Sequence, residues 1–567
     1  MYVAMLLLLV ASPVAVYSSV NGGTSCIACT ASVSLVDQLA LVHTEGIDKA
    51  MQRLCSFLPD DYKSVCKEFV SLAGPIIIDL LANGENPDTV CQALQVCKTE
   101  PPNPTCHMYP KPKNGFHVDA HRSKIMTKYS DKLKEIADID ICGMLPGLKQ
   151  ICKLADRLPH AGPGEYMPKV DFDGDGYSTL DVLRGTSWRG KDCDDRRAAL
   201  HPGARPEDWD RYEDSNCNGI YGIDPVSSKP YEQLLCADSD PMGIVVLGDS
   251  GAAHFHIPGE WFTPSILNME MFLNVTFVAG NELDWPSMSA VTGFQNLTMP
   301  IIHGWTDSLY QRLRQRNLCN HRDYQSIAVN GGACGNMNTI VKSLSRNQQK
   351  DYPVLAIYSL VANDVCNGHP DTIAHMTTPA EMRQETLITL DYLDTVLPKG
   401  SSLVITGMFD GTIVYRYMHN LFHPLGQLRK DLTYATVYEY LMCLQISPCN
   451  GWMSANETLR NLTSERGAAL SRVLQDLVEK SNYTNYKLYY LDFAIGINAE
   501  IDNYINHGGS AADIFESVDG FHPAQTLQRI LSEYIWSNLM AKHPQTLGRV
   551  NTNNEQILKL FGDQGGY

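Results

Sequence analysis

The sequence predicts an α/β protein in which a three-layer α/β/α domain follows a small helical unit and a loop-rich acidic segment. After Cys236, continuous apolar runs alternate with helical or loop segments, which is typical of a parallel sheet buried on both faces. Before residue 100, six cysteines lie on segments with helical apolar spacing. Between Asp171 and Asp214, acidic side chains are concentrated among glycines. A chain of 567 residues with 44% hydrophobic content is too long for one core, so we expect two or more domains.

Residues 1–22 have the pattern of a signal peptide, because an apolar block ends among small residues before Gly23. A membrane anchor is the alternative, but the block is shorter than the ~20 apolar residues that a membrane span needs. Seventeen cysteines and five N-x-T sequons fit an oxidising compartment. We therefore expect a glycoprotein that is secreted or lies in the lumen of endosomal–lysosomal vesicles. The expected glycosylation sites are Asn274, Asn296, Asn456, Asn461 and Asn482.

The formal net charge is −18, which argues against nucleic acid as a partner. Binding to a duplex requires clustered Lys and Arg that neutralise phosphates. Much of the acidity is local and suits metal binding better than general solubility.

Residues 23–100 form the first expected domain. Its cysteines follow a distinctive order, namely a close pair, a lone cysteine, another after a short interval, and a final pair, and this spacing resembles the saposin-B family. The resemblance implies a lipid-binding helical domain. Six cysteines allow fifteen possible pairings, and the resemblance implies one of them. The implied disulfides are Cys26–Cys97, Cys29–Cys91 and Cys55–Cys66. The apolar run 72–82 would line the inner face of an open V, or it would be part of a closed core. For the domain as a whole, the alternative to lipid contact is a purely structural helical cap.

Residues 101–168 are expected to be a linker. The segment begins with prolines, turns briefly helical near Lys132–Ala137, and becomes rich in Gly and Pro between Arg157 and Pro168. This last stretch is a candidate cleavage site for maturation into two disulfide-linked chains, with an uncleaved loop as the alternative. Six of the seventeen cysteines belong to the helical domain, so eleven remain, and the odd one is expected to be free or linked elsewhere.

Residues 169–224 are predicted to bind calcium. Asp171-Phe-Asp-Gly-Asp-Gly-Tyr-Ser178 matches the first half of a calcium loop, but position twelve is Val182 instead of Glu, which excludes an EF-hand. Later acids and amides supply the missing oxygens, and the order of an aspartate-rich loop, DCDD, PGA and DxNCxG resembles known calcium-binding repeats. The resemblance implies more than one structural Ca²⁺ ion, whereas zinc is disfavoured by the oxygen-rich ligand set; a solvated acidic loop is the alternative. The expected ligands are Asp171, Asp173, Asp175, Tyr177, Asp192, Asp194, Asp195, Asp208, Asp214, Asn216 and Asn218, and Cys193 and Cys217 are expected to join the two acidic stretches.

Residues 236–545 are expected to form the catalytic domain. Its expected strands lie at 243–250, 327–329, 354–360, 403–408 and 488–493. Functional groups of such sheets gather at the carboxyl ends of strands, where Ser250 lies. Gly248-Asp-Ser-Gly251 is not the G-x-S-x-G elbow of α/β-hydrolases. It resembles the first block of the GDSL, or SGNH, hydrolase family.

Three further blocks occur in the family's order. They are Ala328-Val-Asn-Gly-Gly332, Val361-Ala-Asn-Asp364, in which valine replaces the usual glycine, and Asp519-Gly-Phe-His-Pro523. The resemblance implies a nucleophile, a general base and an orienting carboxylate, which are Ser250, His522 and Asp519. The implied oxyanion donors are Ser250, Gly331 and Asn363, with Gly332 as a near alternative.

Rival bases and purely structural roles for these residues stay open. His254 and His256 are rival bases because they are close to Ser250 in sequence. Asn363 could simply cap the helix after its strand, and Asp519 could simply close a loop.

The combination of a saposin-like module, a calcium segment and a GDSL-type domain resembles a family of secreted lipid hydrolases. It implies removal of secondary, acyloxy-linked fatty acyl chains from the lipid A of bacterial lipopolysaccharide, with possible action on phospholipid membranes or micelles and no need for a redox cofactor. Three alternatives stay open: a phospholipase or other acyl esterase, a non-catalytic lipid-transfer protein, and a secreted carbohydrate esterase.

Overall fold

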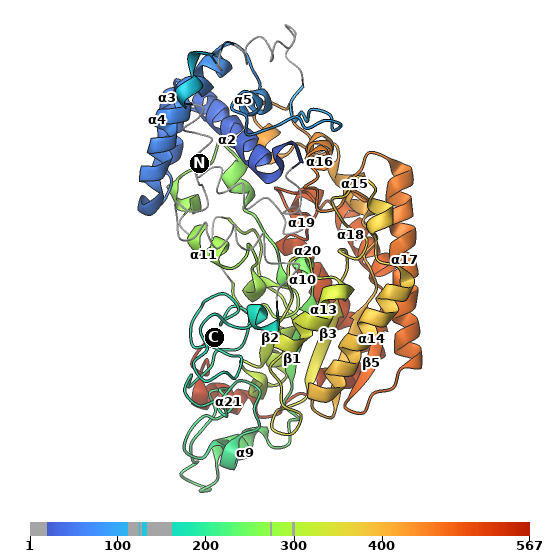
Figure 1. Ribbon diagram of the computed structural model, residues 1–567. Coiled ribbons are helices and arrows are strands. Elements are labelled where there is room, and N and C mark those ends of the chain that lie inside the picture. Colours follow the sequence, from blue (N-terminus) through green and yellow to red (C-terminus); the bar gives the residue numbers. More distant parts are fainter. Residues whose placement is uncertain (1–19, 111–123, 125–126, 133–161, 273–274, 297–300) are drawn as a thin grey trace.

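The computed structural model describes residues 20–110, 124, 127–132, 162–272, 275–296 and 301–567. A helical N-terminal unit lies at one end of the molecule, the helix α9 (Tyr231–Cys236) lies at the other, and a sheet-containing domain lies between them (Figure 1). One continuous cluster of buried apolar residues extends from the helical unit into the sheet domain. The N-terminal unit is therefore packed onto the rest of the chain.

The N-terminal unit consists of α2 (Gly23–Val42), α3 (Ile47–Ser56), α4 (Asp60–Ala82) and α5 (Pro87–Ala93). Helix α2 packs on α5, and α3 packs on α4. The structure contains the disulfides Cys26–Cys97, Cys29–Cys91 and Cys55–Cys66. The apolar run 72–82 lies on α4, and its residues Ala73, Ile76, Ile77 and Leu80 are buried. In this structure the run is therefore core and not an open apolar face.

The helical unit begins slightly before residue 23 and ends beyond residue 100. Asn21 is buried, its Nδ2 donates to the carbonyl oxygen of Pro104 (2.8 Å), and its Oδ1 accepts from the backbone N–H of Glu100 (2.9 Å). Residues 20–22 and the start of the expected linker thus pack with the helices. The segment Val20–Val42 is long and apolar enough to cross a membrane by length and composition, but 67% of its apolar window is buried inside the protein. The expected cleavage stretch is described only from Gly162 on, and most of the helix expected near Lys132–Ala137 lies outside the described residues.

The acidic segment runs along the edge of the sheet domain with little regular structure. The short 3₁₀ helix η3 (Pro163–Tyr166) precedes it, η4 (Glu207–Asp210) lies within it, and the disulfide Cys193–Cys217 connects its two acidic stretches. The backbone N–H of Gly190 donates to the carbonyl oxygen of Tyr324 in the edge strand (2.9 Å). The segment is thereby attached to the sheet.

The sheet contains five parallel strands in the order β2-β1-β3-β4-β5. They are β1 (Gly243–Gly248), β2 (Tyr324–Ser326), β3 (Val354–Ser359), β4 (Ser401–Thr406) and β5 (Tyr486–Leu491). The expectation of a strand at 327–329 was wrong, because β2 ends at Ser326. The backbone N–H groups of Ile327 and Val329 still bond to β1, which explains the apolar run there. The chain passes from β1 to one neighbour, β2, and then to the other, β3, so the carboxyl end of β1 is the switch point at which open α/β sheets bind ligands.

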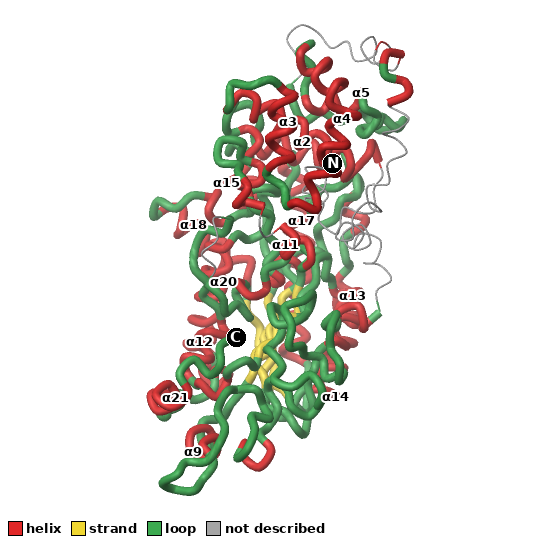
Figure 2. Tube along the Cα trace, turned by 90° about the vertical axis from the view of Figure 1, so that its left-hand side faces the viewer, coloured by secondary structure: helices red, strands yellow, loops and turns green. Residues whose placement is uncertain are grey.

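Helices cover both faces of this sheet, as expected for a three-layer fold. Figure 2 shows the strands between α12 (Leu309–Arg316) and α20 (Gln525–Lys542) on one side and α13 (Cys334–Ile340) and α14 (Pro379–Val396) on the other. Helix α17 (Glu457–Lys480) packs on α14, β4 and β5. The other helices of this domain are α10 (Ser250–Ala253), α11 (Val275–Gly280), α15 (Thr412–Met418), α16 (Tyr434–Cys443), α18 (Phe493–Asn506), α19 (Ala511–Ile514) and α21 (Asn554–Phe561). Further 3₁₀ turns are η2 (Val20–Gly22), η5 (Gly259–Phe262), η6 (Met269–Phe272), η7 (Pro286–Met288), η8 (Leu318–Asn320), η9 (Val341–Ser343), η10 (Thr372–His375), η11 (Pro424–Gly426) and η12 (Pro544–Leu547).

The chain beyond the expected boundary at residue 545 returns to the acidic segment. The Gln564 amide donates to the carbonyl oxygens of Asn218 (2.7 Å) and Leu318 (3.0 Å). The packed domain therefore includes the C-terminal residues.

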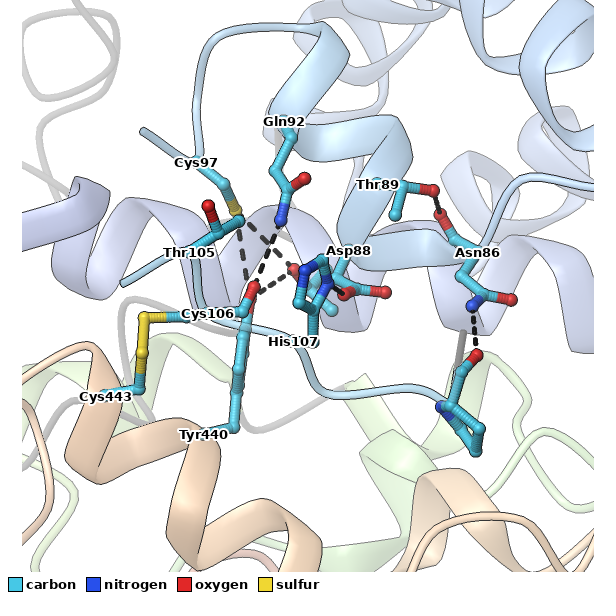
Figure 3. A network of polar contacts seen from close by, with 12 residues as sticks. Asn86, Asp88, Thr89, Gln92, Cys97, Thr105, Cys106, His107, Tyr440 and Cys443 are labelled. Atoms are coloured by element: carbon cyan, nitrogen blue, oxygen red, sulfur yellow. Dashed lines mark hydrogen bonds and ion pairs between the residues drawn. A yellow bond between two sulfur atoms is a disulfide. The ribbon is translucent and has the colours of Figure 1, made fainter. Parts of the chain in front are cut away.

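Helix α16 joins the N-terminal unit to the sheet domain. Its Cys443 forms a disulfide with Cys106 (Figure 3). The Tyr440 hydroxyl on the same helix lies 2.9 Å from Thr30 Oγ1 of α2. The remaining disulfides are Cys236–Cys319 and Cys366–Cys449. Among the cysteines that the structure describes, Cys334 alone is free, and it is buried.

Candidate active site

Ser250 lies directly after β1, at the first residue of α10. The turn requires Gly248, because a Cβ atom there would lie 2.4 Å from Ala252 Cβ and 2.9 Å from the Ser359 carbonyl oxygen. Ser250 Oγ lies 2.8 Å from His522 Nε2, and His522 Nδ1 lies 2.5 Å from Asp519 Oδ2. Ser250 and His522 are 272 positions apart in the sequence. The structure brings them together with Asp519 as a hydrogen-bonded chain from hydroxyl to imidazole to carboxylate.

The electrostatics of this chain suit proton transfer. Burial acts to lower the pKa of His522, but the Asp519 carboxylate with its hydrogen bond and the Asp249 and Glu516 carboxylates together act in the opposite direction, so the pKa of His522 is raised above its ordinary value. A carboxylate facing Nδ1 keeps the proton on that nitrogen and leaves Nε2 free to accept from Ser250. The imidazole can therefore act as a base toward the hydroxyl.

The loop that carries Asp519 and His522 is held in place by α16 and by its own backbone. The hydroxyl of Tyr438 donates to the Gly520 carbonyl oxygen (2.6 Å), and the hydroxyl of Tyr434 donates to the Ser517 carbonyl oxygen (2.5 Å). Asp519 Oδ1 accepts the backbone N–H groups of residues 521 and 522 at 2.8 and 3.1 Å. The two tyrosines were missed from the sequence, where no pattern links them to a loop about 80 positions away.

Neither rival base hydrogen-bonds to Ser250, whose hydroxyl pairs with His522. His254 is fully buried, and burial lowers its pKa to about 3. His256 Nδ1 bonds to Glu516, and its Nε2 lies 3.0 Å from the Ile301 carbonyl oxygen. Of the three histidines, His522 is the one that contacts Ser250.

Asp249 was also missed as a functional residue, although it lies inside the GDS motif. Its Oδ1 accepts from the Gly251 N–H (3.0 Å), and its Oδ2 accepts from the N–H groups of Val361 and Ala362 (2.9 and 3.2 Å). Burial raises the pKa of Asp249 to about 6. This side chain connects the first block to the third and so positions Asn363 relative to Ser250.

Of the proposed oxyanion donors, Ser250 and Asn363 line the same cavity. Gly331 has φ +75°, a left-handed conformation that favours glycine, and its N–H makes no hydrogen bond to any described residue. The Gly332 N–H instead donates to the Val329 carbonyl oxygen (2.8 Å), which favours Gly331 over Gly332 as a donor. Asn363 Nδ2 donates to the Gly332 carbonyl oxygen (3.1 Å) and Asn363 lines the cavity at Ser250. The Ser250 N–H likewise has no partner among the described residues.

An apolar cavity opens beside Ser250 and His522. The cavity is partly open to solvent, and Ser250, His522 and Asn363 all line it. Its apolar lining comes from Val291, Val361, Phe409, Phe493, Ile497, Phe515, Phe521, Leu527, Leu531 and Ile535. Such a lining can take up a hydrocarbon chain while the ester lies at Ser250.

Five of the expected metal ligands form two adjoining clusters in the acidic segment, Asp171/Asp173/Asp195 and Asp173/Asp175/Asp192, with ligand oxygens within 4.8 Å of one another in each. One carboxylate oxygen of each of Asp173, Asp175, Asp192 and Asp195 is buried without a hydrogen-bond partner. Burial raises the pKa of Asp175 to about 8. A hard cation would satisfy these oxygens, so the residues fit Ca²⁺.

The other expected ligands divide into two groups. Asp194 pairs with Arg197 (2.7 Å) and Asp208 is exposed beside Arg211 (3.4 Å), so neither carboxylate joins the clusters, because arginine competes for them. The second group is Asp214, Asn216 and Asn218, whose two amide groups donate to the buried carboxylate of Glu232 at 3.1 Å. Glu232 was missed because it follows the acidic segment on α9. The Tyr177 ring is buried and its hydroxyl accepts from Gln325 Nε2 (2.8 Å).

The structure describes four of the five candidate glycosylation sites. Asn296, Asn456, Asn461 and Asn482 are exposed, as a glycan requires, and Asn274 lies outside the described residues.

Comparison with known proteins matches both parts of the fold. The family model of the saposin-like domain matches residues 25–153, and that of the GDSL-like lipase/acylhydrolase matches residues 244–535. The chain is 43% identical over 552 residues to acyloxyacyl hydrolase from Homo sapiens, covering 97% of this chain and 94% of that protein. It is 43% identical to acyloxyacyl hydrolase from Mus musculus over 553 residues, with the same coverage. Prosaposin from Gallus gallus is 34% identical over 88 residues, 16% of each chain.

Proposed function

This chain belongs to the acyloxyacyl hydrolases, with a GDSL-like lipase/acylhydrolase domain, and from that premise we propose that it removes secondary, acyloxy-linked fatty acyl chains from the lipid A of bacterial lipopolysaccharide. It is an esterase that acts on acyl chains. The choice of lipid A as substrate and the roles of single residues are the proposed parts.

One observation carries the proposal: the Ser250–His522–Asp519 chain lies at the mouth of a cavity with an apolar lining. A long acyl chain in this cavity would place its ester carbonyl beside the hydroxyl. A carbohydrate esterase has no need of so apolar a cavity, and a lipid-transfer protein has no need of the hydrogen-bonded triad.

Ser250 Oγ attacks the ester carbonyl carbon as His522 Nε2 takes the hydroxyl proton. The N–H groups of Ser250 and Gly331 and the Asn363 amide stabilise the oxyanion of the tetrahedral intermediate. The intermediate collapses to an acyl-enzyme, and His522 returns the proton to the departing alkoxide. Water, deprotonated by His522, then releases the fatty acid and restores Ser250.

The helical unit presents lipid to this site. Its saposin-like fold and its packing against α16 support this role. The structure also supports maturation into two chains, since Cys106 precedes the candidate cleavage stretch and Cys443 follows it, and their disulfide would keep the products together. Disulfides, exposed sequons and the apolar N-terminal block support a secreted or endosomal–lysosomal protein.

Calcium is proposed to be structural. The unsatisfied oxygens of Asp173, Asp175 and Asp192 lie in the acidic segment, and none of these residues lines the cavity at Ser250. When bound, Ca²⁺ offsets the mutual repulsion of these carboxylates. The ion then stabilises the folded segment on the sheet edge and takes no part in ester cleavage.

The test is an assay of the purified full-length protein on lipopolysaccharide and on phospholipid vesicles, with released fatty acids identified by mass spectrometry. Secondary acyl chains should be released from lipopolysaccharide, leaving the primary 3-hydroxyacyl chains on the sugar. The Ser250→Ala variant, which removes one nearly buried hydroxyl, should keep its fold and release none. Release from phospholipid alone would instead identify a phospholipase.

A further inference from the structure

The loop that follows Asn363 is fastened at both ends. At its start Cys366 forms a disulfide with Cys449. At its end the Thr377 N–H donates to the Asp364 carbonyl oxygen (2.8 Å), and Arg466 donates to the carbonyl oxygens of Met376 and Thr377 (3.1 and 2.9 Å). The segment 367–376 between these points is therefore a short loop of restricted mobility that leads into α14.

Three metal-ligating side chains project from this loop. The rings of His369 and His375 are stacked with centroids 3.8 Å apart and an angle of 6° between planes. His375 Nδ1 lies 3.1 Å from Asp371 Oδ1. One ligand atom from each of the three residues lies within 4.8 Å of the other two, and all three side chains are exposed.

We propose that His369, Asp371 and His375 form a binding site for a borderline transition-metal ion of the Zn²⁺ class. Imidazole and carboxylate are ligands of zinc, whereas calcium takes oxygen ligands alone, so this site differs in selectivity from the acidic segment. Bonds of about 2.0–2.2 Å in a tetrahedral site hold ligand atoms about 3.3–3.5 Å apart, so the two imidazoles must rotate out of their stacked arrangement to direct one nitrogen each at a shared ion. Three protein ligands leave one position to water.

The backbone beneath the three side chains is already ordered. Asn450 Nδ2 donates to the His369 carbonyl oxygen (2.8 Å), and Asn367 Nδ2 donates to the Thr372 carbonyl oxygen (3.1 Å). Asn367 Oδ1 accepts from the His369 N–H (3.1 Å). Metal binding therefore has to order only side chains, which reduces the entropic cost of closing the site.

The experiment uses the full chain saturated with Ca²⁺, so that the acidic segment is filled before Zn²⁺ is added. Bound zinc is measured by equilibrium dialysis and mass spectrometry, and Co²⁺ is used in parallel because its visible absorption reports tetrahedral nitrogen ligation. We expect one equivalent of Zn²⁺ that is absent from the double variant H369A/H375A. Each single variant should bind at least about tenfold more weakly, since even the loss of an outer-shell partner has that effect.

His507→Ala is the matched control, because both histidines are exposed and have the same local contact. His507 Nδ1 lies 2.8 Å from the Asn503 carbonyl oxygen four residues earlier, as His375 Nδ1 lies 3.4 Å from that of Asp371. This variant should bind zinc as the unmodified chain does. Equal zinc stoichiometry and affinity in the double variant, with an unchanged melting temperature, would overturn the proposal. So would a Co²⁺ spectrum that is the same with and without the two histidines.

Discussion

Changing Asp519 to Asn gives a sharp test of the proposed triad, because the structure determines which way the new amide would face. Asp519 Oδ1 accepts two backbone N–H groups, so the remaining oxygen of the amide must take that place. The NH₂ group would then face His522 Nδ1 and force that nitrogen to act as acceptor. The imidazole proton would move to Nε2, where it faces Ser250, and the base would be lost.

The expected loss in kcat is about 10⁴-fold, or about 5.5 kcal/mol of transition-state stabilisation, as for the same change in comparable triads. The assay is the initial rate on a short, soluble acyl ester, together with the melting temperature. Asp513→Asn is the control, since it makes the same chemical change at an exposed site nearby. A folded Asp519→Asn variant with less than about a tenfold loss would refute the triad assignment.

The pH dependence provides a second readout of the same change. The pKa of His522 is raised above its ordinary value, and the base must be neutral, so activity should increase with pH through an apparent pKa above that of a free histidine. Without the Asp519 carboxylate, the largest influence that raises the pKa of His522 is lost, and burial lowers this pKa against the smaller effects of Asp249 and Glu516. The acid limb of the residual activity should therefore shift to lower pH, and an unshifted limb would mean that another group titrates.

Three further changes test other parts of the site. Asn363→Ala should lower kcat about 10²–10³-fold with little effect on KM, the usual result of losing one oxyanion donor, and a pure KM defect would contradict that role. Chelation of Ca²⁺, or Asp173→Ala, should lower the melting temperature, because an ion that binds only the folded state stabilises it; loss of turnover at low temperature with no structural change would instead place calcium in catalysis. Leu531→Trp narrows the apolar cavity, so hydrolysis should shift toward shorter acyl esters, each excluded CH₂ forgoing about 0.8 kcal/mol of burial. An unchanged chain-length profile would mean that the acyl chain lies elsewhere.

The local parts of the fold and site were predictable from the sequence. Apolar runs located four of the five strands to within two or three residues, and short motifs identified Ser250, Asp519 and His522, which the structure brings together. These predictions depend on periodicity and on motifs whose residues are neighbours in the chain. β2 was misplaced because Ile327–Val329 is apolar and bonds to β1 just beyond the strand.

The parts that escaped prediction depend on contacts between distant residues. Tyr434 and Tyr438 bond to carbonyl oxygens about 80 positions away, and backbone carbonyls carry no sequence signal. Glu232 joins Asn216 and Asn218 from a different element. Asp194 and Asp208 fitted a ligand pattern, but nearby arginines pair with their carboxylates, and that competition is visible only in three dimensions.

Helix α16 couples the N-terminal helical unit to the triad loop in thermodynamic terms. One side of the helix contacts Thr30 through Tyr440, and another holds the Gly520 carbonyl through Tyr438. A lipid that displaces α2 relative to α16 therefore perturbs the free energy of the loop that orients His522. Thermodynamic linkage makes this coupling reciprocal. If acylation of Ser250 changes the stability of this loop, it must also change the affinity of the helical unit for lipid, by the same factor. Product release and lipid release would then be a single coupled equilibrium.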